Sequence, residues 1–248
     1  MNISAIQNVI VVPCFNEAKR WNLEYWEQFT SLSNTYLLFV DDGSTDGTHF
    51  YIARTLKRNR GEYFALNENQ GKANAVRLGM LRAGKKFPNS KTISFLDADG
   101  SVSYSDVQRL ISKDIPADFD SIWSSRANLS GRNIERALLR HWISRSIATF
   151  FGFFFPYLPY DTQCGFKIFK NESTLIEALQ NPFKTTWFFD LELITHFDNL
   201  RIWEEPLGCW REVSGSKIEK FHYLKIFKEL VTVFVELRKY DIRISRIE

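Results

Sequence analysis

The chain has 248 residues, a formal net charge of +3, and a composition with 44% hydrophobic and 25% charged residues. A chain of this length buries one sizeable core, and this composition excludes disordered, collagen-like and multi-span membrane proteins. The mildly basic charge is far from the strong single-sign field of nucleic-acid binders, so no nucleic-acid partner is expected. The aromatic content stands out, because 22 Phe, 9 Tyr and 7 Trp accompany only 2 Met.

Three cysteines and the absence of a long apolar segment limit the setting of the protein. Cys14, Cys164 and Cys209 are too few and too widely spaced for a disulfide framework or a zinc cluster, which favours a reducing, cytoplasmic environment. The first residues have no basic residue before their short apolar run, so they predict a strand and not a signal peptide. The longest uncharged segment, residues 146–160, is 15 residues long, whereas a membrane-spanning helix needs about 20.

The first hundred residues alternate between strand and helix patterns. Continuous apolar runs predict strands at residues 8–12, 36–40, 63–66 and 92–96, and helical spacing predicts helices at residues 17–32, 45–60 and 72–83. This alternation predicts an α/β, Rossmann-like fold with a mostly parallel sheet and helices on both faces. We expect one catalytic domain, residues 1–217, followed by an amphipathic helical segment, residues 218–248.

Each of the four predicted strands ends in a polar loop: PCFNE, DDGSTDG, NENQGK and DADG. Ligands of open α/β sheets bind at this carboxyl edge. Ordinary turn chemistry explains any one of these loops but explains four in succession poorly. Glu17, Asp41 and Asp42 could accept hydrogen bonds from a nucleobase and a ribose, and Lys72 is a further candidate for nucleotide binding.

Asp97 and Asp99 flank Ala98 directly after the fourth strand, so both carboxylates point to the same side of the extended chain. Two hard oxygen donors suit Mg²⁺ or Mn²⁺, which keeps open positions for phosphate oxygens. The chain has no Walker A sequence and no G-x-G-x-x-G, which argues against a P-loop or a dinucleotide-binding site. A nucleotide-sugar, with its diphosphate neutralised by the metal, fits these residues.

Eight motifs in a fixed order then resemble one known family. They are VVPCFNE, VDDGSTDGT, NQGKANAVRLGM, FLDADG, SSR, DTQCGFKIF, FFDLEL and REVSGSK. Together they are similar to the family 2 glycosyltransferases of GT-A fold, and most of all to the branch that glucosylates or mannosylates dolichyl phosphate. The resemblance covers residues 9 to about 217.

The resemblance implies roles for individual positions of this sequence. It implies donor-nucleotide contacts for Pro13, Phe15, Glu17, Val40 and Asp42, and a metal and diphosphate motif at Asp97, Ala98 and Asp99. It implies phosphate contacts, from catalytic residues, for Arg126, Arg211 and Lys217. It implies an acidic pair at Asp190 and Glu192, either a base or a structural pair, while Asp161 and Gln163 are expected to line the sugar or acceptor site.

A row of cations precedes a dense aromatic block. Arg132, Arg136 and Arg140 are four residues apart, so on a helix they would share one face. Residues 147–160 then hold seven aromatic residues among 14. The ordinary explanations are a solvated helix face for the arginines and a buried core for the aromatic block. An interfacial segment whose arginines bind a lipid phosphate explains the arginines and the aromatic block together. Arg132 is then a further candidate for binding the acceptor phosphate.

Residues 218–239 predict a helix that is too apolar for an ordinary surface helix. Its apolar arc contains Phe221, Leu224, Phe227, Leu230, Val231, Val233, Phe234 and Leu237. Polar side chains, Glu229 and Glu236 among them, gather on the remainder, where the two glutamates weaken attraction to anionic lipid. The helix could lie on a membrane, pack on the domain or pair with another chain, and we favour the membrane surface.

The leading hypothesis is an inverting, metal-dependent hexosyltransferase at the cytoplasmic face of a membrane. It moves glucose from UDP-glucose, or mannose from GDP-mannose, onto a polyprenyl or dolichyl phosphate. Two alternatives remain: a soluble family 2 enzyme that glycosylates a saccharide or protein hydroxyl, and a non-catalytic module that binds a nucleotide-sugar or a lipid phosphate. The sequence leaves the oligomeric state open. In the leading hypothesis, the aromatic surplus contacts a bilayer or a lipid chain.

Overall fold

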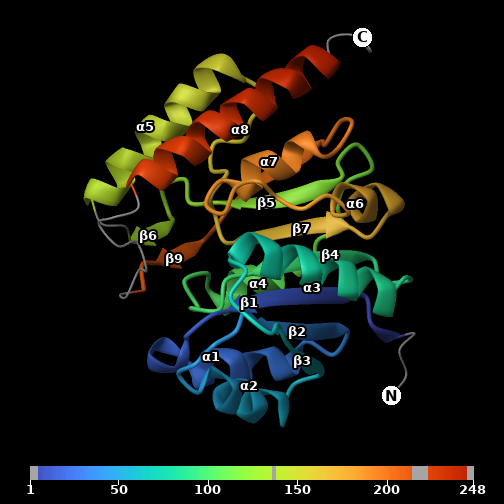
Figure 1. Ribbon diagram of the computed structural model, residues 1–248. Helices are drawn as coiled ribbons and strands as arrows, with labels where there is room; N and C mark the ends of the chain where they lie inside the picture. Colours follow the sequence, from blue (N-terminus) through green and yellow to red (C-terminus); the bar gives the residue numbers. More distant parts are fainter. Residues whose placement is uncertain (1–4, 136–137, 214–222, 245–248) are drawn as a thin grey trace.

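The computed structural model describes residues 5–135, 138–213 and 223–244 (Figure 1). A seven-stranded sheet with the order β3-β2-β1-β4-β7-β5-β8 forms its centre. Only β7 runs antiparallel to its neighbours within this sheet. The strands are β1 (Asn8–Cys14), β2 (Thr35–Asp41), β3 (Gly61–Ala65), β4 (Thr92–Leu96), β5 (Ser121–Ser125), β7 (Phe166–Lys170) and β8 (Ile202–Pro206). A small parallel pair, β6 (Asn133–Glu135) and β9 (Cys209–Arg211), lies beside them.

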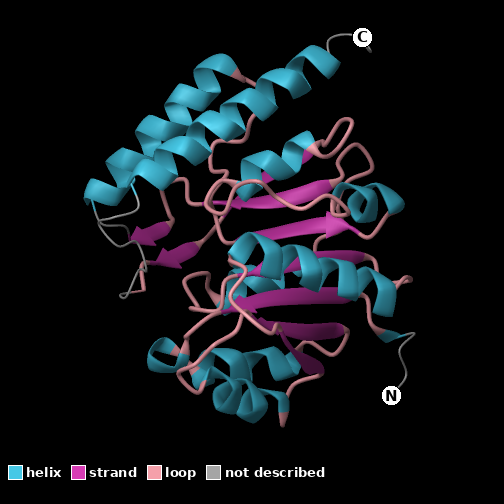
Figure 2. Cartoon of the chain, viewed as in Figure 1, coloured by secondary structure: helices cyan, strands magenta, loops and turns pink. Residues whose placement is uncertain are grey.

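Helices cover both faces of the sheet (Figure 2). They are α1 (Leu23–Glu27), α2 (Thr48–Leu56), α3 (Lys72–Lys86), α4 (Tyr104–Ile111), α5 (Leu138–Phe154), α6 (Ser173–Ala178), α7 (Phe189–Thr195) and α8 (Tyr223–Ile244). Side chains alternate along a strand, so Val9 and Val11 pack with α3, α6 and α7, while Ile10 and Val12 pack with α1, α2 and α4. The predicted mostly parallel sheet with helices on both faces is confirmed.

The four predicted strands are present, but two predicted helices are wrong in extent. Residues 17–32 form the 3-10 helix Ala18–Arg20, then α1, then a second 3-10 helix. The break occurs because Trp21 is extended and the Asn22 side chain accepts a hydrogen bond from the Tyr25 N–H, which starts a new helix. The helix predicted at residues 45–60 begins only at Thr48, since Gly47 before it has a φ of +88°.

Helices α5 and α8 lie side by side against α7 on one side of the molecule (Figure 1). Phe151 of α5 and Phe155, the residue directly after α5, pack with Val233 and Leu237 of α8 in a third apolar cluster. Tyr240 of α8 also joins the core under the sheet. None of the helices in the described ranges is long and apolar enough to cross a membrane.

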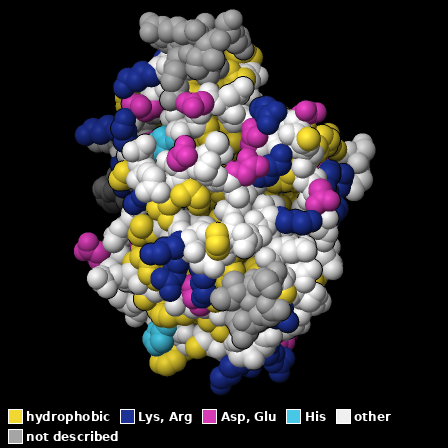
Figure 3. Space-filling view, turned by 90° about the vertical axis from the view of Figure 1, so that its right-hand side faces the viewer, with side chains coloured by type: hydrophobic (Ala, Val, Ile, Leu, Met, Phe, Trp, Pro, Cys, Tyr) yellow, Lys and Arg dark blue, Asp and Glu magenta, His cyan; other side chains and the backbone are white. Residues whose placement is uncertain are grey.

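The structure corrects one prediction about α8 and one about the aromatic rings of the two predicted lipid-facing segments. Glu229 was expected on the polar face, but it is buried, because it accepts hydrogen bonds from the N–H groups of Thr186 and Trp187 at 2.9 and 2.7 Å. The aromatic rings divide between two environments, since Phe150, Phe153 and Phe227 are exposed whereas Phe151 and Phe155 are buried. Phe221 lies outside the described residues. On the face drawn in Figure 3, basic and acidic side chains are interspersed.

Candidate active site at the carboxyl edge of the sheet

The carboxyl ends of the parallel strands β1, β2 and β4 meet at one edge of the sheet. We call it the acidic edge, because the loops after these strands carry Glu17, Asp41, Asp42, Asp97 and Asp99. Asp97 directly follows β4, and its N–H donates to the carbonyl of Gly165 at 2.9 Å. A Cβ at Gly165 would overlap the Asp97 carboxylate, so this glycine provides space for the carboxylate. The close approach of Gly165, in the segment before β7, fixes where Asp97 points.

Lys72, the first residue of α3, forms an ion pair with Asp97, with Nζ and Oδ1 2.5 Å apart. Its ammonium lies 6.0 Å from the centre of the Phe189 ring. Burial opposes the charge on Lys72, but Asp97 and Asp190 outweigh burial and raise the pKa of this ammonium. Lys72 therefore stays cationic at the centre of the acidic edge.

Asp99 lies beside a second cation. Its Oδ1 accepts a hydrogen bond from the Ser101 N–H at 3.0 Å, and its Oδ2 lies 4.0 Å from Nη1 of Arg20. Arg20 also holds both carboxylate oxygens of Glu17, at 2.5 and 2.6 Å. Burial and the charge of Asp97 raise the pKa of the Asp99 carboxyl. The two aspartates thus interact electrostatically, as carboxylates that share one cation site do.

The other acidic candidates hold the loops of this edge in place. Asp42 accepts the N–H groups of Gln70 and Gly71, both at 2.8 Å, which fixes the turn before α3. Asp41 accepts the Tyr63 hydroxyl at 2.7 Å and the Ser44 N–H at 3.0 Å. Both carboxylates are buried and hydrogen-bonded within the protein, so their first role is to hold these loops in position.

The predicted nucleotide contacts with small or apolar side chains differ in accessibility. Pro13 and Phe15 are half-buried at the end of β1. The Val40 side chain is fully buried in the core between the sheet and α3, so a nucleotide cannot reach it. Ala98 is also buried, packed with the α1 and α4 side of the core. A nucleotide contact predicted at Val40 would therefore involve the backbone of this residue.

A buried ion pair between Lys167 and Asp190 lies next to the acidic edge. Nζ of Lys167 in β7 is fully buried and donates to Oδ1 of Asp190 at 2.5 Å and to the Cys164 carbonyl at 2.8 Å. Oδ2 of Asp190 faces Nε2 of Gln163 at 3.4 Å. Burial raises the pKa of the Asp190 carboxyl, while Lys167 and Lys72 act against that shift. Asp190 is thus tied to a permanent partner.

Glu192, the other member of the predicted acidic pair, faces a different part of the fold. It accepts the N–H groups of Lys184 and Thr185 and the Thr185 hydroxyl, all at 2.8 Å. Burial by itself would raise the pKa of Glu192. Hydrogen bonds with His196 and with residues 184–185 outweigh burial, so the pKa of Glu192 is lowered. The structure therefore places Glu192 as an anchor of residues 184–185 and does not bring it to the acidic edge with Asp190.

Arg126 follows β5 and is held in a two-pronged ion pair. Its Nε and Nη2 donate to the two oxygens of Asp161, each at 2.7 Å, and its guanidinium lies 5.3 Å from the centre of the Trp210 ring. Burial opposes the charge, but Asp161 outweighs it and raises the pKa of Arg126. Arg126 is thus a fixed, partly buried cation beside the small sheet.

The small sheet places one exposed arginine, Arg211, next to the DADG loop. Arg211 at the end of β9 donates its N–H to the Ser101 carbonyl at 3.1 Å, and its side chain lies 3.9 Å from Glu135. Arg132 is exposed directly before β6. The predicted helical row of arginines is wrong at its first member, because residues 133–135 form a strand. Arg136 and Lys217 lie outside the described residues, as does the side chain of Arg140.

The carboxylates at this edge could hold a divalent metal only together with further ligands. Among the residues that the structure describes, no group of three or more His, Cys, Asp or Glu side chains could enclose an ion. Asp97 and Asp99 alone offer two carboxylates with accessible oxygens, and Mg²⁺ is commonly bound by one or two carboxylates together with substrate phosphates. The site therefore fits a metal that arrives with, or is completed by, a diphosphate.

Two residues of this edge were missed at the level of sequence. Arg20 lies three residues after Glu17, a spacing that brings both side chains to one face of a helical turn. Lys167 interrupts the apolar strand FKIF, and a charge in a buried strand needs a partner. The spacing and the interrupted strand were both visible in the sequence.

Comparisons with known proteins identify the family of this chain. Residues 9–176 match the model of Glycosyl transferase family 2. The chain belongs to this family. Among curated proteins, this glycosyltransferase is 30% identical to the dolichyl-phosphate beta-glucosyltransferase of Saccharomyces cerevisiae, over 90% of this chain and 73% of that protein. It is also 30% identical to the enzyme of the same name from Homo sapiens, over 92% of this chain and 74% of that protein.

Solved structures show that the glycosyltransferase has the GT-A fold. A mannosyltransferase from Pyrobaculum calidifontis, in complex with GDP-Man and Mn²⁺, superposes with a TM-score of 0.61 at 16% identity. The match covers 94% of this chain and 64% of that one, so this chain spans just under two thirds of its length. Glucosyl-3-phosphoglycerate synthase from Mycobacterium tuberculosis gives a TM-score of 0.63 at 13% identity, over 95% and 80% of the two chains.

Proposed function

We propose that this glycosyltransferase transfers glucose from UDP-glucose to dolichyl phosphate, or to a related polyprenyl phosphate, at the cytoplasmic face of a membrane. The observation that carries the proposal is the similarity to dolichyl-phosphate beta-glucosyltransferases, which extends over 90% of the chain. The catalytic unit is residues 1–217, and residues 218–248 serve as the attachment segment.

The acidic edge binds the donor. Asp97 and Asp99 hold a Mg²⁺ or Mn²⁺ ion, which supplies charge neutralisation for the diphosphate leaving group. Lys72 lies within reach of the same phosphates, because its ammonium is 2.5 Å from Asp97. Arg20 adds a second cation on the Asp99 side. In this assignment Pro13, Phe15, Glu17, Asp41 and Asp42 contribute the surface for the nucleoside.

The acceptor requires cations and no strong base. A phosphate monoester is ionised near neutral pH, so one of its oxygens attacks C1 of the donor sugar directly. The bond between C1 and the β-phosphate oxygen of UDP breaks, UDP leaves with the electron pair, and the anomeric configuration inverts. The enzyme's contribution is then positioning and charge stabilisation. Arg211 is exposed at the end of β9 and Arg132 directly before β6, and the Arg211 N–H donates to the carbonyl of Ser101, two residues after Asp99.

The remaining polar residues have supporting roles in this reaction. Arg126 is fixed by Asp161 beside the same sheet, so it orients a phosphate from a rigid position. Gln163 donates its backbone N–H to Asp161 and its side-chain amide to Asp190. Because Asp190 has Lys167 as a permanent partner, we assign it to positioning and not to proton removal. Lys217 completes the set of phosphate-binding cations predicted from the sequence.

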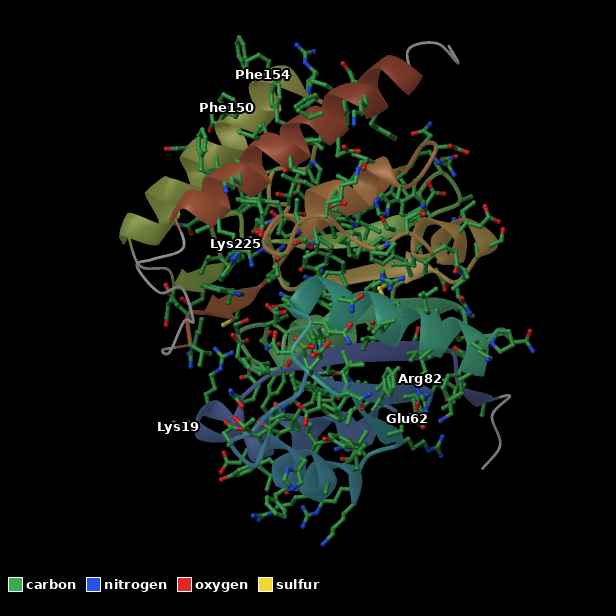
Figure 4. All side chains as sticks on the ribbon, viewed as in Figure 1. Lys19, Glu62, Arg82, Phe150, Phe154 and Lys225 are labelled. Atoms are coloured by element: carbon green, nitrogen blue, oxygen red, sulfur yellow. The ribbon has the colours of Figure 1, made fainter. Side chains whose placement is uncertain are left out.

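An exposed apolar surface on α5 and α8 is suited to contact the lipid phase. Its members, which we call the α5–α8 apolar surface, are Phe150, Phe153, Phe227, Val231 and Val235, and each is at least two-fifths exposed. A groove of about 440 Å³ separates the two helices, with walls of Ile147 and Phe150 on one side and Phe227 and Val231 on the other. Figure 4 shows Phe150 and Phe154 on α5, at the end of the molecule away from β1 to β3.

The charges around this surface favour an anionic bilayer as its occupant. Glu229 is buried, and Glu236 is paired with Lys184 and Lys239, each at 3.0 Å, so neither glutamate leaves a free negative charge beside the rings. Lys225 and Lys228 are exposed on the same helix, and Figure 4 places Lys225 at its first turn, on the side of β6 and β9. Apolar rings flanked by lysines are typical of helices that lie in the headgroup region.

A transfer assay tests the proposal. Purified full-length protein is incubated with UDP-[¹⁴C]glucose or GDP-[¹⁴C]mannose, Mn²⁺ or Mg²⁺, and a short polyprenyl phosphate in detergent. We expect label in the organic phase with UDP-glucose, acid-labile as a glycosyl phosphate is, and none without metal. Transfer to a saccharide or peptide hydroxyl, with no lipid product from either donor, would overturn the assignment of the acceptor.

A further inference from the structure

Four consecutive backbone N–H groups, those of residues 184–187, are held by two buried glutamates from different helices. Glu192 of α7 accepts those of Lys184 and Thr185, and Glu229 of α8 accepts those of Thr186 and Trp187. Hydrogen bonds from backbone N–H groups to a charged acceptor are stronger than those between neutral groups. The segment is therefore fixed jointly by the sheet-bound helix and by the C-terminal helix.

The segment held by Glu229, residues 186–187, contacts the acidic edge at Gly71. Gly71, the residue before Lys72, has a φ of +89°, and a Cβ at this position would lie 2.9 Å from Cγ2 of Thr186. The N–H of Gly71 is itself bonded to Asp42. Two residues after Trp187, the Phe189 ring lies next to the Lys72 ammonium. A continuous set of contacts thus runs from Glu229 through Thr186 and Gly71 to Lys72, the partner of Asp97.

We propose that Glu229 is a positioning residue for the donor site, so that α8 completes the phosphate-binding edge as well as contributing to the apolar surface. The proposal rests on the proposed donor site. By holding the N–H groups of Thr186 and Trp187, Glu229 keeps Thr186 against Gly71 and Phe189 beside Lys72. The turn before α3 can then present Lys72 to a donor diphosphate in one position.

Matched variants separate positioning from plain stability. Glu229→Leu keeps the size of the side chain and removes both hydrogen bonds, while Glu229→Gln keeps a neutral acceptor oxygen in the same place. Glu236→Gln is the control on the same helix, because Glu236 meets residues 184–187 only through the Lys184 side chain. Thr186→Ala leaves the residues of α8 unchanged and removes the methyl group that lies against Gly71, together with the hydroxyl group on the same carbon.

The first measurement is amide hydrogen exchange of full-length protein, followed in peptides covering residues 66–80. We expect at least threefold faster exchange in Glu229→Leu and in Thr186→Ala, near wild-type rates in Glu229→Gln, and wild-type rates in Glu236→Gln. Faster exchange confined to residues 184–188 in Glu229→Leu would overturn the proposal. Should Glu229→Leu fail to fold, Thr186→Ala and the graded effect of Glu229→Gln decide the outcome by the same criterion.

The second measurement is calorimetric binding of UDP with Mn²⁺, made where circular dichroism shows each variant fully folded. We expect the Kd to rise about tenfold in Glu229→Leu and less than threefold in Glu229→Gln. A lower melting temperature with an unchanged Kd would show a structural role only and would overturn the proposal. Wild-type protein that binds neither UDP nor GDP would contradict the proposed function itself, whereas the exchange experiment reports the coupling without any nucleotide.

Discussion

The acidic edge and the α5–α8 apolar surface solve opposite problems of solvation. At the edge, each carboxylate of Glu17, Asp42 and Asp97 already has a fixed donor or a cation. On the helices, rings such as Phe153, 82% exposed, have water on most sides. Satisfied charges make a rigid site that a ligand enters by exchanging partners, whereas exposed rings gain only when another apolar phase covers them.

The largest effect expected at the acidic edge comes from Asp99→Asn. It removes one of the two carboxylates assigned to the metal, and a bound metal supplies several kcal/mol of charge stabilisation, so transfer should fall on the order of 10³-fold. The measurement is label transfer at saturating Mn²⁺. Asp114→Asn, which changes an almost fully exposed carboxylate, is the control and should keep full activity. Equal activities of the two variants would remove Asp99 from the metal site.

Lys167→Met tests whether the acidic edge depends on its buried support. This change leaves Asp190 buried without its cation, and breaking a buried pair in this way costs about 3–5 kcal/mol of unfolding free energy. Urea unfolding measures the loss. The double variant Lys167→Met with Asp190→Leu should recover most of it, because both charges are then gone. A double variant as unstable as the single one would contradict the role assigned to the pair.

The two faces of α5 and α8 should respond in opposite ways. Phe153→Ser combined with Phe227→Ser should lower binding to anionic vesicles about tenfold or more in a flotation assay, since burying one such ring contributes about 1.5–3 kcal/mol. The unfolding free energy should change little, because both rings are exposed. Phe50→Ser, a similarly exposed ring on α2, is the control and should float as wild type does. Unchanged flotation of the double variant would exclude this surface as the membrane contact.

Phe155→Ala sharpens the same contrast from the buried side. This ring is fully buried between α5, α7 and α8, so its loss should cost about 3–5 kcal/mol of unfolding free energy. Chemical denaturation measures the cost, and vesicle binding of the folded protein should be unaffected. Reduced flotation at full folding would mean that Phe155 reaches the lipid.

The smallest effect concerns pH and Glu192. Its pKa is lowered in the folded protein, so its ionised form stabilises the fold fully above the ordinary Glu value of about 4.3 and loses this contribution as the pH falls through the folded value. Glu192→Gln should therefore cost about 1–3 kcal/mol at pH 7, with the difference from wild type shrinking in acid. The melting temperature against pH measures this, with the exposed Glu177→Gln as a control that should stay parallel to wild type. A pH-independent gap would contradict an ionic role.

Local patterns were sufficient for the donor half of the molecule. Strands such as residues 92–96 are short apolar runs that end in acidic turns, and parallel pairing brings these ends together whatever else the chain does. The position of Asp97 and Asp99 at this edge followed from that rule. Periodicity could not show that Arg132 precedes a strand, because the pairing of β6 with β9 joins segments more than 70 residues apart.

The sequence by itself determined the alternation of strands and helices, the family and the acidic edge, because each depends on residues close together in the chain. Only the tertiary structure decided which side of α8 is buried, since Glu229 finds its donors in a segment some 40 residues earlier. It also divided the aromatic surplus into a packed set around Phe155 and an exposed set around Phe153. Composition gives the number of aromatic rings, but the burial of each ring depends on which helix packs against it.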